Sequence, residues 1–118
     1  MITLTNKPDV ALKKLVNDIL FGLINDDYGI ILGKLSHEYG KWTKERIRSE
    51  LLKATNGKQV SEFLSIKITD PPVVSGDEAM YEYRQRIPID GEWSNAFVVL
   101  RLHRKNKPLY ALELVGFS

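Results

Sequence analysis

The spacing of apolar residues changes once along this chain, near residue 60, and that change limits the folds available to it. Before this point apolar residues recur at steps of three and four, which is typical of helices that pack by one face. After it they alternate with polar residues, which is typical of strands. Helices that come first, followed by strands that come together, indicate an α+β fold. A chain of 118 residues predicts one domain, residues 1–118.

Three helices are predicted in the first half of the chain. The first begins at Pro8 and runs for about eighteen residues, long enough to cross four strands, before the run 25–27 (Asn-Asp-Asp) interrupts its pattern. Its apolar face comprises Leu12, Leu15, Val16, Ile19, Leu20 and Leu23. A short second helix is predicted from Tyr28 to Ser36. A third runs from Lys44 to Ala54, with Thr43 as its N-cap.

Four strands follow in the second half. They are predicted at 64–69, at Met80 to Ile89, at Ser94 to Arg104 and at Leu109 to Phe117. Turn-forming residues separate them at 75–77, 90–91 and 105–108. Pro88 indicates a sheet edge or a bulge, because proline has no N–H to donate. The expected architecture is three N-terminal helices packed on a curved four-stranded antiparallel meander sheet.

The last two strands are apolar on both of their faces. The second face carries Phe97, Val99, Arg101 and His103 on one strand, and Leu109, Ala111, Glu113, Val115 and Phe117 on the other. A sheet with helices on one side normally alternates between apolar and polar residues. Three explanations are open: the sheet curls around a pocket, a partner or a second copy covers this face, or the strands are enclosed. A homodimer through the last two strands is therefore one expectation.

Composition excludes several chemistries. The chain has no Cys, which rules out disulfides, thiolate nucleophiles and Cys-ligated metals. His37 and His103 are its two histidines and match no zinc motif, and we find no nucleophile elbow or phosphate-binding loop. We expect no metal, no cofactor and no enzymatic activity. With no signal peptide or membrane-length apolar run, we expect a cytoplasmic protein that does not bind membranes.

The net charge of +2 is unevenly placed. One basic group comprises Arg101, Arg104, Lys105 and Lys107, and a second comprises Lys41, Lys44, Arg46, Arg48 and Lys53. Such groups attract nucleic acid when they form one patch. The expected explanation here is a solvated turn and a solvated helix face. Because a dedicated nucleic-acid binder has a larger basic excess, nucleic acid is not the expected partner.

Aromatic and arginine side chains gather around the predicted strand at 80–89. Tyr, Trp and Arg are the residue types that most often anchor protein interfaces. The predicted partner-binding patch therefore consists of Tyr81, Tyr83, Arg84, Arg86 and Trp93. Tyr81 and Tyr83 share one face of the strand, because side chains alternate with a period of two. The alternative is ordinary packing of the tyrosine rings across strands, with their hydroxyls in water.

The order of elements resembles the NTF2-like, cystatin-like cone. The segment from Leu20 to Leu35, in which a long helix, an Asn-Asp-Asp-Tyr turn and a short helix follow one another, carries this resemblance. It implies helices that close over a curled sheet and a pocket between them. Tyr28, Trp42 and His103 are the pocket residues that it suggests. The function it implies is binding or turnover of a small molecule.

A second resemblance is one of kind. Small, single-domain, cysteine-free α+β bacterial proteins without a catalytic signature resemble the immunity proteins of contact-dependent growth inhibition and related polymorphic toxin systems. Such proteins bind a toxin domain and occlude its active site. The leading hypothesis is therefore a non-enzymatic inhibitor of a toxin domain, and the NTF2-like pocket protein is the alternative.

Overall fold

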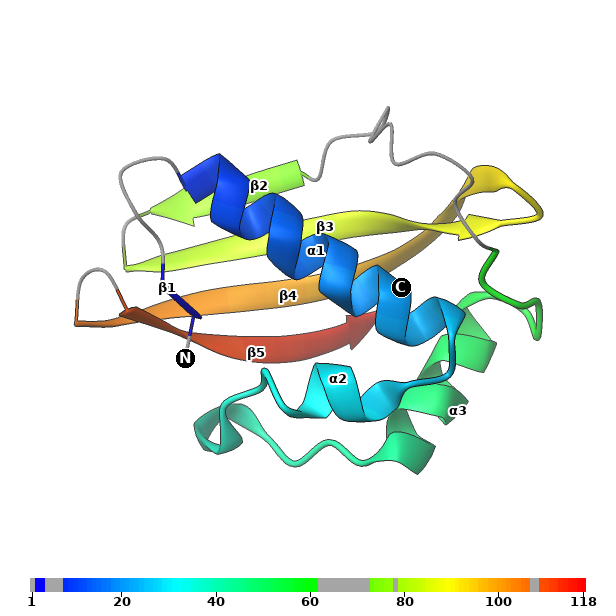
Figure 1. Cartoon of the computed structure of the whole chain (residues 1–118), viewed down its shortest axis with the longest axis horizontal. Helices are drawn as coiled ribbons and strands as arrows, with labels where there is room; N and C mark the ends of the chain where they lie inside the picture. Colours follow the sequence, from blue (N-terminus) through cyan, green and yellow to red (C-terminus); the bar gives the residue numbers. More distant parts are fainter. Residues whose placement is uncertain (1, 4–7, 62–72, 78, 107–108) are drawn as a thin grey trace.

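The computed structural model describes residues 2–3, 8–61, 73–77, 79–106 and 109–118. It shows one antiparallel sheet with helices against it (Figure 1), which confirms the α+β class. The helices are α1 (Pro8–Ile24), α2 (Tyr28–Leu32), the 3-10 helix η1 (His37–Tyr39) and α3 (Lys44–Ala54). The strands are β1 (Ile2–Thr3), β2 (Val73–Asp77), β3 (Met80–Ile89), β4 (Glu92–Asn106) and β5 (Leu109–Phe117).

The prediction of a four-stranded sheet is wrong. The described sheet has five strands in the order β1-β5-β4-β3-β2, so two short strands at its edges were not predicted. A two-residue strand such as β1 is too short to show alternation, and β2 contains the run 75–77, which reads as a turn. Both are strands because they pair with a long neighbour, β5 and β3 respectively. The strand predicted at 64–69 lies outside the described residues.

Helix boundaries follow local chemistry where the helix ends are free. The bounds of α3 are those predicted, and the Thr43 hydroxyl accepts a hydrogen bond from the Arg46 N–H at 3.1 Å. The second helix is shorter than predicted and ends at Leu32. Beyond it the N–H of Ser36 donates to the carbonyl of Leu112 at 2.9 Å. The predicted C-terminal bound of this helix is wrong, because the chain at Ser36 hydrogen-bonds to the edge of β5 and does not continue the helix.

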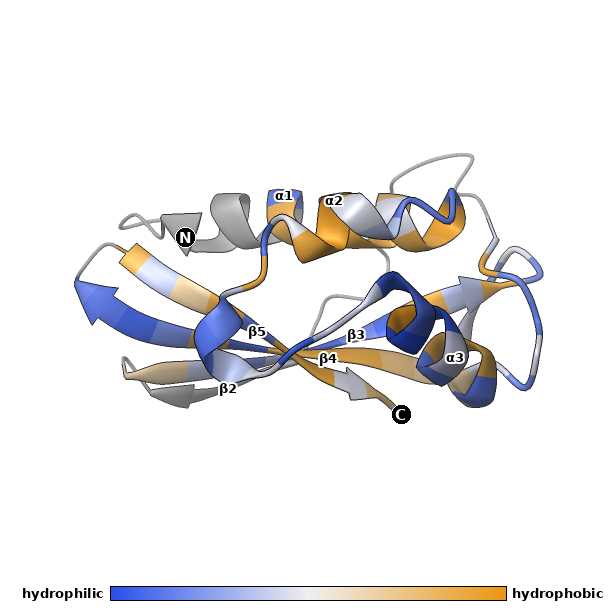
Figure 2. Cartoon of the chain, turned by 90° about the horizontal axis from the view of Figure 1, so that it is seen from below, coloured by the Kyte–Doolittle hydropathy of each residue, from blue (hydrophilic) through white to orange (hydrophobic). Residues whose placement is uncertain are grey.

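The helices are not all in one layer. Figure 2 shows α1 and α2 above the sheet, whereas α3 lies lower, beyond the edge formed by β5. The apolar face of α1 packs on the central strands. The resulting core contains Leu15, Val16, Ile19, Leu20 and Leu23 of α1, Ile31 of α2, Ile47 and Leu51 of α3, and Tyr83, Ile87, Val98, Leu100, Leu102, Leu112 and Leu114 of the sheet.

Strand register determines which residues face this core. Leu100 pairs with Tyr83 on one side and with Leu114 on the other, so these three side chains lie on the helix side. The register between β4 and β5 shifts after Val99, which inserts Val115 as an extra residue and turns Phe117 toward the core. The placement of Phe117 on the second face is therefore wrong. The bulge expected at Pro88 is confirmed by a register shift between β3 and β4.

The crossing of α1 and α2 leaves little space at Gly22. A Cβ added there would lie 3.0 Å from the carbonyl oxygen of Asp27 and 3.1 Å from Cγ1 of Ile31. Such contacts force the helices apart or a side chain out of its rotamer. Gly22 is therefore required for close packing of the two helices rather than for a special backbone angle.

We expect Gly22→Ala to destabilise the chain by about 1–3 kcal/mol, although alanine has the higher helix propensity. Gly29→Ala is the matched control, because a Cβ there meets only Asp27 Oδ1 at 3.5 Å. That variant should be neutral or more stable. Urea denaturation of both variants gives the free energies of unfolding, and a stabilised Gly22→Ala variant would contradict the packing described here.

Candidate functional site

The face of the sheet opposite α1 is the candidate site. In the part of the chain that the structure describes, no α-helix covers this side of β3 and β4 (Figure 2). The pairing register places alternate residues of β3, β4 and β5 together here. We call this surface the open face, and it comprises Glu82, Arg84, Arg86, Phe97, Val99, Arg101, His103, Ala111 and Glu113.

Two guanidinium groups flank an aromatic ring at one end of the open face. The guanidinium carbon of Arg84 lies 4.9 Å from the centroid of the Phe97 ring, and that of Arg86 lies 5.5 Å from it. Both distances are within the range of a cation–π contact, about 6 Å. Arg84 also donates to the Ser118 hydroxyl at 3.5 Å. The ring supports both cations, and it holds the exposed guanidinium of Arg84 in an orientation suited to an acceptor.

A stacked ring pair covers the other end of the open face. The rings of Tyr39 and His103 are 3.9 Å apart and nearly parallel, at 8°. His103 Nε2 donates to Glu113 Oε1 at 2.8 Å. Lys105 binds Glu38 at 2.6 Å, and this hydrogen bond raises the pKa of the lysine. Together these contacts fix η1 against the sheet and reduce access to His103.

The charges along the open face differ in their partners. In its middle, Arg101 is paired with Glu82 at 3.5 Å. Arg84, by contrast, is exposed and contacts a ring and a hydroxyl, neither of which carries a charge. The positive potential available to a partner is therefore strongest beside Phe97.

The predicted partner patch is divided between two faces. Tyr83 is 4% exposed in the core, and Tyr81 packs against Tyr110 with ring centroids 5.9 Å apart. Trp93 is half-buried against the same core. Arg84 and Arg86 lie on the open face, since neighbouring residues of a strand point to opposite sides. The structure therefore does not bring the five residues together on one surface, and the two tyrosine rings take the alternative role of packing within the sheet.

The predicted pocket residues do not line one cavity. Tyr28 is 7% exposed, and its hydroxyl donates to Asp26 Oδ1 at 2.9 Å. The indole N–H of Trp42 donates to the carbonyl of Leu114 at 2.8 Å, so this ring lies at the edge of β5. His103 lies on the open face, on the other side of the sheet.

Side chains also fill the space predicted for that pocket. Val98, Leu100 and Leu112 are at most 1% exposed, and they pack in one cluster with the apolar face of α1. The sheet and α1 are therefore in direct contact at these positions. A small-molecule site, if the fold has one, lies elsewhere.

The outer edge of β5 is occupied along its length. Tyr110 pairs with Ile2 of β1, the carbonyl of Leu112 accepts from Ser36, and that of Leu114 accepts from Trp42. A second chain has little access to this backbone. A homodimer through the last two strands would have to use the open face rather than strand pairing at the edge.

At least three of the nine basic residues singled out in the sequence have acidic partners, from other elements or the same helix. Besides Arg101 and Lys105, Arg46 is paired with Glu50 at 2.9 Å. Lys107 lies outside the described residues. These pairs place Glu50 beside a cation of α3 and Glu38 beside a cation of the final hairpin.

No family model, no curated protein and no solved structure matches the chain. Within the described ranges, no group of three His, Asp or Glu side chains is placed to hold a metal ion. None of the described helices combines the length and the apolar character that crossing a membrane requires.

Sequence reasoning missed two contacts on the open face. The spacing of Arg84 and Arg86 shows that they share a face, but only the register of β4 brings Phe97 to them. Tyr39 lies 64 positions from His103 along the chain, and no local pattern links them. The one available signal was the two-residue spacing of Phe97 and Val99. This spacing predicted that both lie on the same face of the strand, but not which residues contact them there.

Tyr28 gives a pH-dependent prediction. Burial and the hydrogen bond to Asp26 raise the pKa of Tyr28 to about 12. The unfolded chain loses this proton near the ordinary value of about 10. The stabilising contribution is therefore complete below pH 10 and is lost as the pH rises toward 12.

We expect Tyr28→Phe to lower stability by about 1 kcal/mol at neutral pH, with the difference from the parent chain shrinking between pH 10 and 12. Urea denaturation across this range measures the effect. The same substitution at Tyr81 is the matched control for loss of a phenol elsewhere. A constant difference up to pH 12 would show that the Tyr28 hydroxyl is not held by Asp26.

Proposed function

We propose that this chain is a cytoplasmic protein-binding domain that inhibits its partner, and specifically an immunity-type protein that occludes the active site of a toxin domain. The observation that supports this proposal is the open face, where Arg84 and Arg86 both contact the ring of Phe97 on a sheet side that no described α-helix covers. Aromatic residues and arginine are enriched at the centres of protein interfaces.

The rigidity of this surface favours an inhibitor. Phe97 and Val99 lie on the central strand β4, which pairs with neighbours on both sides. Side chains on a paired strand lose little further freedom when a partner binds, so less of the contact energy is spent on ordering. An inhibitor has to remain bound through many encounters with substrate, and preorganisation contributes to slow dissociation.

The chemistry of the open face also indicates what the partner presents. The exposed guanidinium of Arg84 matches a carboxylate, which arginine binds through two parallel hydrogen bonds. The half-buried ring of Phe97 adds an apolar contact beside it. A toxin domain whose active site is lined by acidic residues beside an apolar patch fits this surface best.

The test uses the full chain and the toxin domain encoded beside it. We expect a stoichiometric complex on size-exclusion chromatography and loss of toxin activity on mixing. Arg84→Glu should weaken binding at least tenfold by calorimetry, because it reverses a charge at the centre of the proposed contact. Phe97→Ala should weaken it to a similar degree, because it removes both the apolar centre and the support of the arginines.

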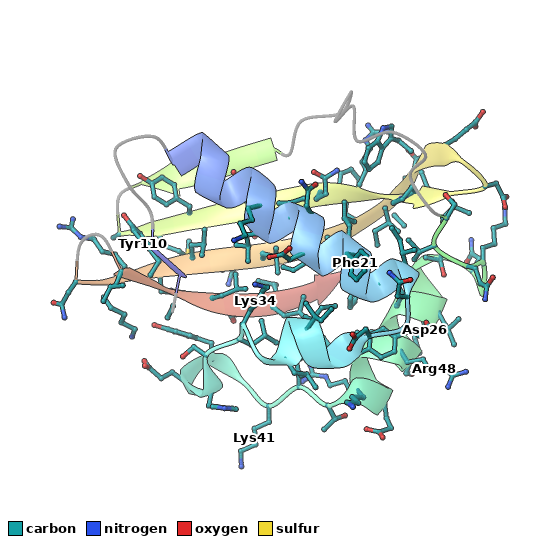
Figure 3. The ribbon with its side chains drawn as sticks, in the orientation of Figure 1. Phe21, Asp26, Lys34, Lys41, Arg48 and Tyr110 are labelled. Carbon is teal, nitrogen blue, oxygen red and sulfur yellow. The ribbon has the colours of Figure 1, made fainter. Side chains whose placement is uncertain are left out.

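Lys41→Glu is the matched control for charge reversal. Lys41 is exposed and points away from the body of the molecule (Figure 3). This variant should bind within twofold of the parent chain. Failure of the parent chain to bind or to protect would exclude the proposed function, and equal losses in Arg84→Glu and Lys41→Glu would exclude the open face as the contact.

A further inference from the structure

A hollow lies at the end of the molecule where α1 stops, away from the centre of the open face. It has a volume of about 440 Å³ and is bounded by the end of α1, the start of α2, α3 and the segment 58–61. Its floor is apolar and includes Leu23 and Leu51, both buried in the core. Pockets for small ligands typically have volumes of about 300–1,000 Å³, so this one is large enough for an organic molecule.

The rim of the hollow leaves an apolar side chain in water. Leu52 lines it and is 43% exposed, one of the few large apolar residues of the described chain with such exposure. Val60, in the segment after α3, also lines the hollow. An apolar group bound against both side chains would remove apolar surface from water, which stabilises a complex by about 25 cal/mol per Å².

Two cations line the same hollow without an ion-pair partner. Arg48 and Lys58 are exposed, and neither forms a salt bridge or side-chain hydrogen bond within the described residues. Other cations of this chain, such as Lys34 with Asp18 at 3.1 Å, are paired. The position of Arg48 next to the α1–α2 turn can be followed in Figure 3.

One acid of the hollow takes part in a local hydrogen bond. Asp26, which lines the hollow with Arg48, accepts a hydrogen bond from the Tyr28 hydroxyl at 2.9 Å. Asp26 also has a left-handed backbone, with φ of 53°, which places it at the turn rather than in a helix. The other acid of the hollow, Asp90, lies at the β3–β4 turn. Neither carboxylate forms an ion pair with Arg48 within the described residues, so the guanidinium of Arg48 is available to an added carboxylate.

We propose that this hollow binds a small amphipathic carboxylate, with the carboxylate at Arg48 and the apolar part against Leu52 and Val60. The arginine fork binds a carboxylate through two hydrogen bonds, and the apolar floor selects against small polar anions such as acetate. The carboxylate can belong to a free organic acid or to the C-terminus of a peptide. This site lies apart from the Arg84–Phe97–Arg86 contact and does not depend on the proposed function.

The experiment is a titration of the ¹⁵N-labelled full chain followed by NMR. The probes are octanoate, for a free acid, and N-acetyl-leucyl-leucine, for a peptide end; octanamide and N-acetyl-leucyl-leucinamide are their uncharged counterparts. We expect at least one of the two acids to shift the amide signals of Leu23, Leu51 and Ser61, and the matching amide to bind about tenfold more weakly. Which acid binds identifies the source of the carboxylate.

Variants of exposed residues keep the test independent of folding. Arg48→Gln should weaken binding about tenfold, and Arg48→Lys should restore part of the loss, since it keeps the charge without the fork. Leu52→Gln should also weaken binding. Lys53→Gln, on the same helix and outside the hollow, is the control and should change affinity less than twofold. No shifts at millimolar probe, equal binding of acids and amides, or equal losses in Arg48→Gln and Lys53→Gln would overturn the proposal.

Discussion

The packing of α1 on the central strands is the contact on which the rest of the structure depends. Leu15, Ile19 and Leu23 are buried against β4 and its neighbours, and burying each such side chain contributes about 1.5–3 kcal/mol. A helix of 17 residues spans about 25 Å and covers one side of a twisted sheet. Because α2 lies beside it and α3 beyond the edge, the other side is left to the strands' own side chains. The open face therefore exists because α1 and α2 bury their apolar surface on one side of the sheet and α3 lies beyond its edge.

The segment from Leu35 to Trp42 connects the two sides of the sheet. It leaves α2 on the helix side, passes the edge of β5 at Ser36, and reaches the open face at Tyr39, whose ring stacks on His103. The indole of Trp42 then returns to β5 at Leu114. Two hydrogen bonds to alternate carbonyls of one strand fix this path. The same contacts that close the edge against aggregation also position one border of the open face.

Periodicity predicted most elements and their bounds, because α1, α3, β3 and β5 each bury one regular face. It failed for β1 and β2, which are strands only through their neighbours. Periodicity also predicted which side chains of a strand share a face, but it did not predict which of the two faces the helices cover. Tyr83 and Arg84 were therefore assigned to one patch, although they lie on opposite faces. The bulge at Val115 and the hollow at Arg48 depend on register and on segments distant in sequence, and neither leaves a local pattern.

The balanced charge of the chain conceals how its cations are distributed in space. Lys105 is paired with an acid 67 positions away and Arg101 with one on the adjacent strand. Arg84 lies on the open face, and Arg48 lines the hollow beside α1. A nucleic-acid backbone needs several cations on one continuous surface, because its affinity comes from the number of phosphates neutralised. Cations held apart beside apolar groups are instead suited to single carboxylates, which is the chemistry that both proposals share.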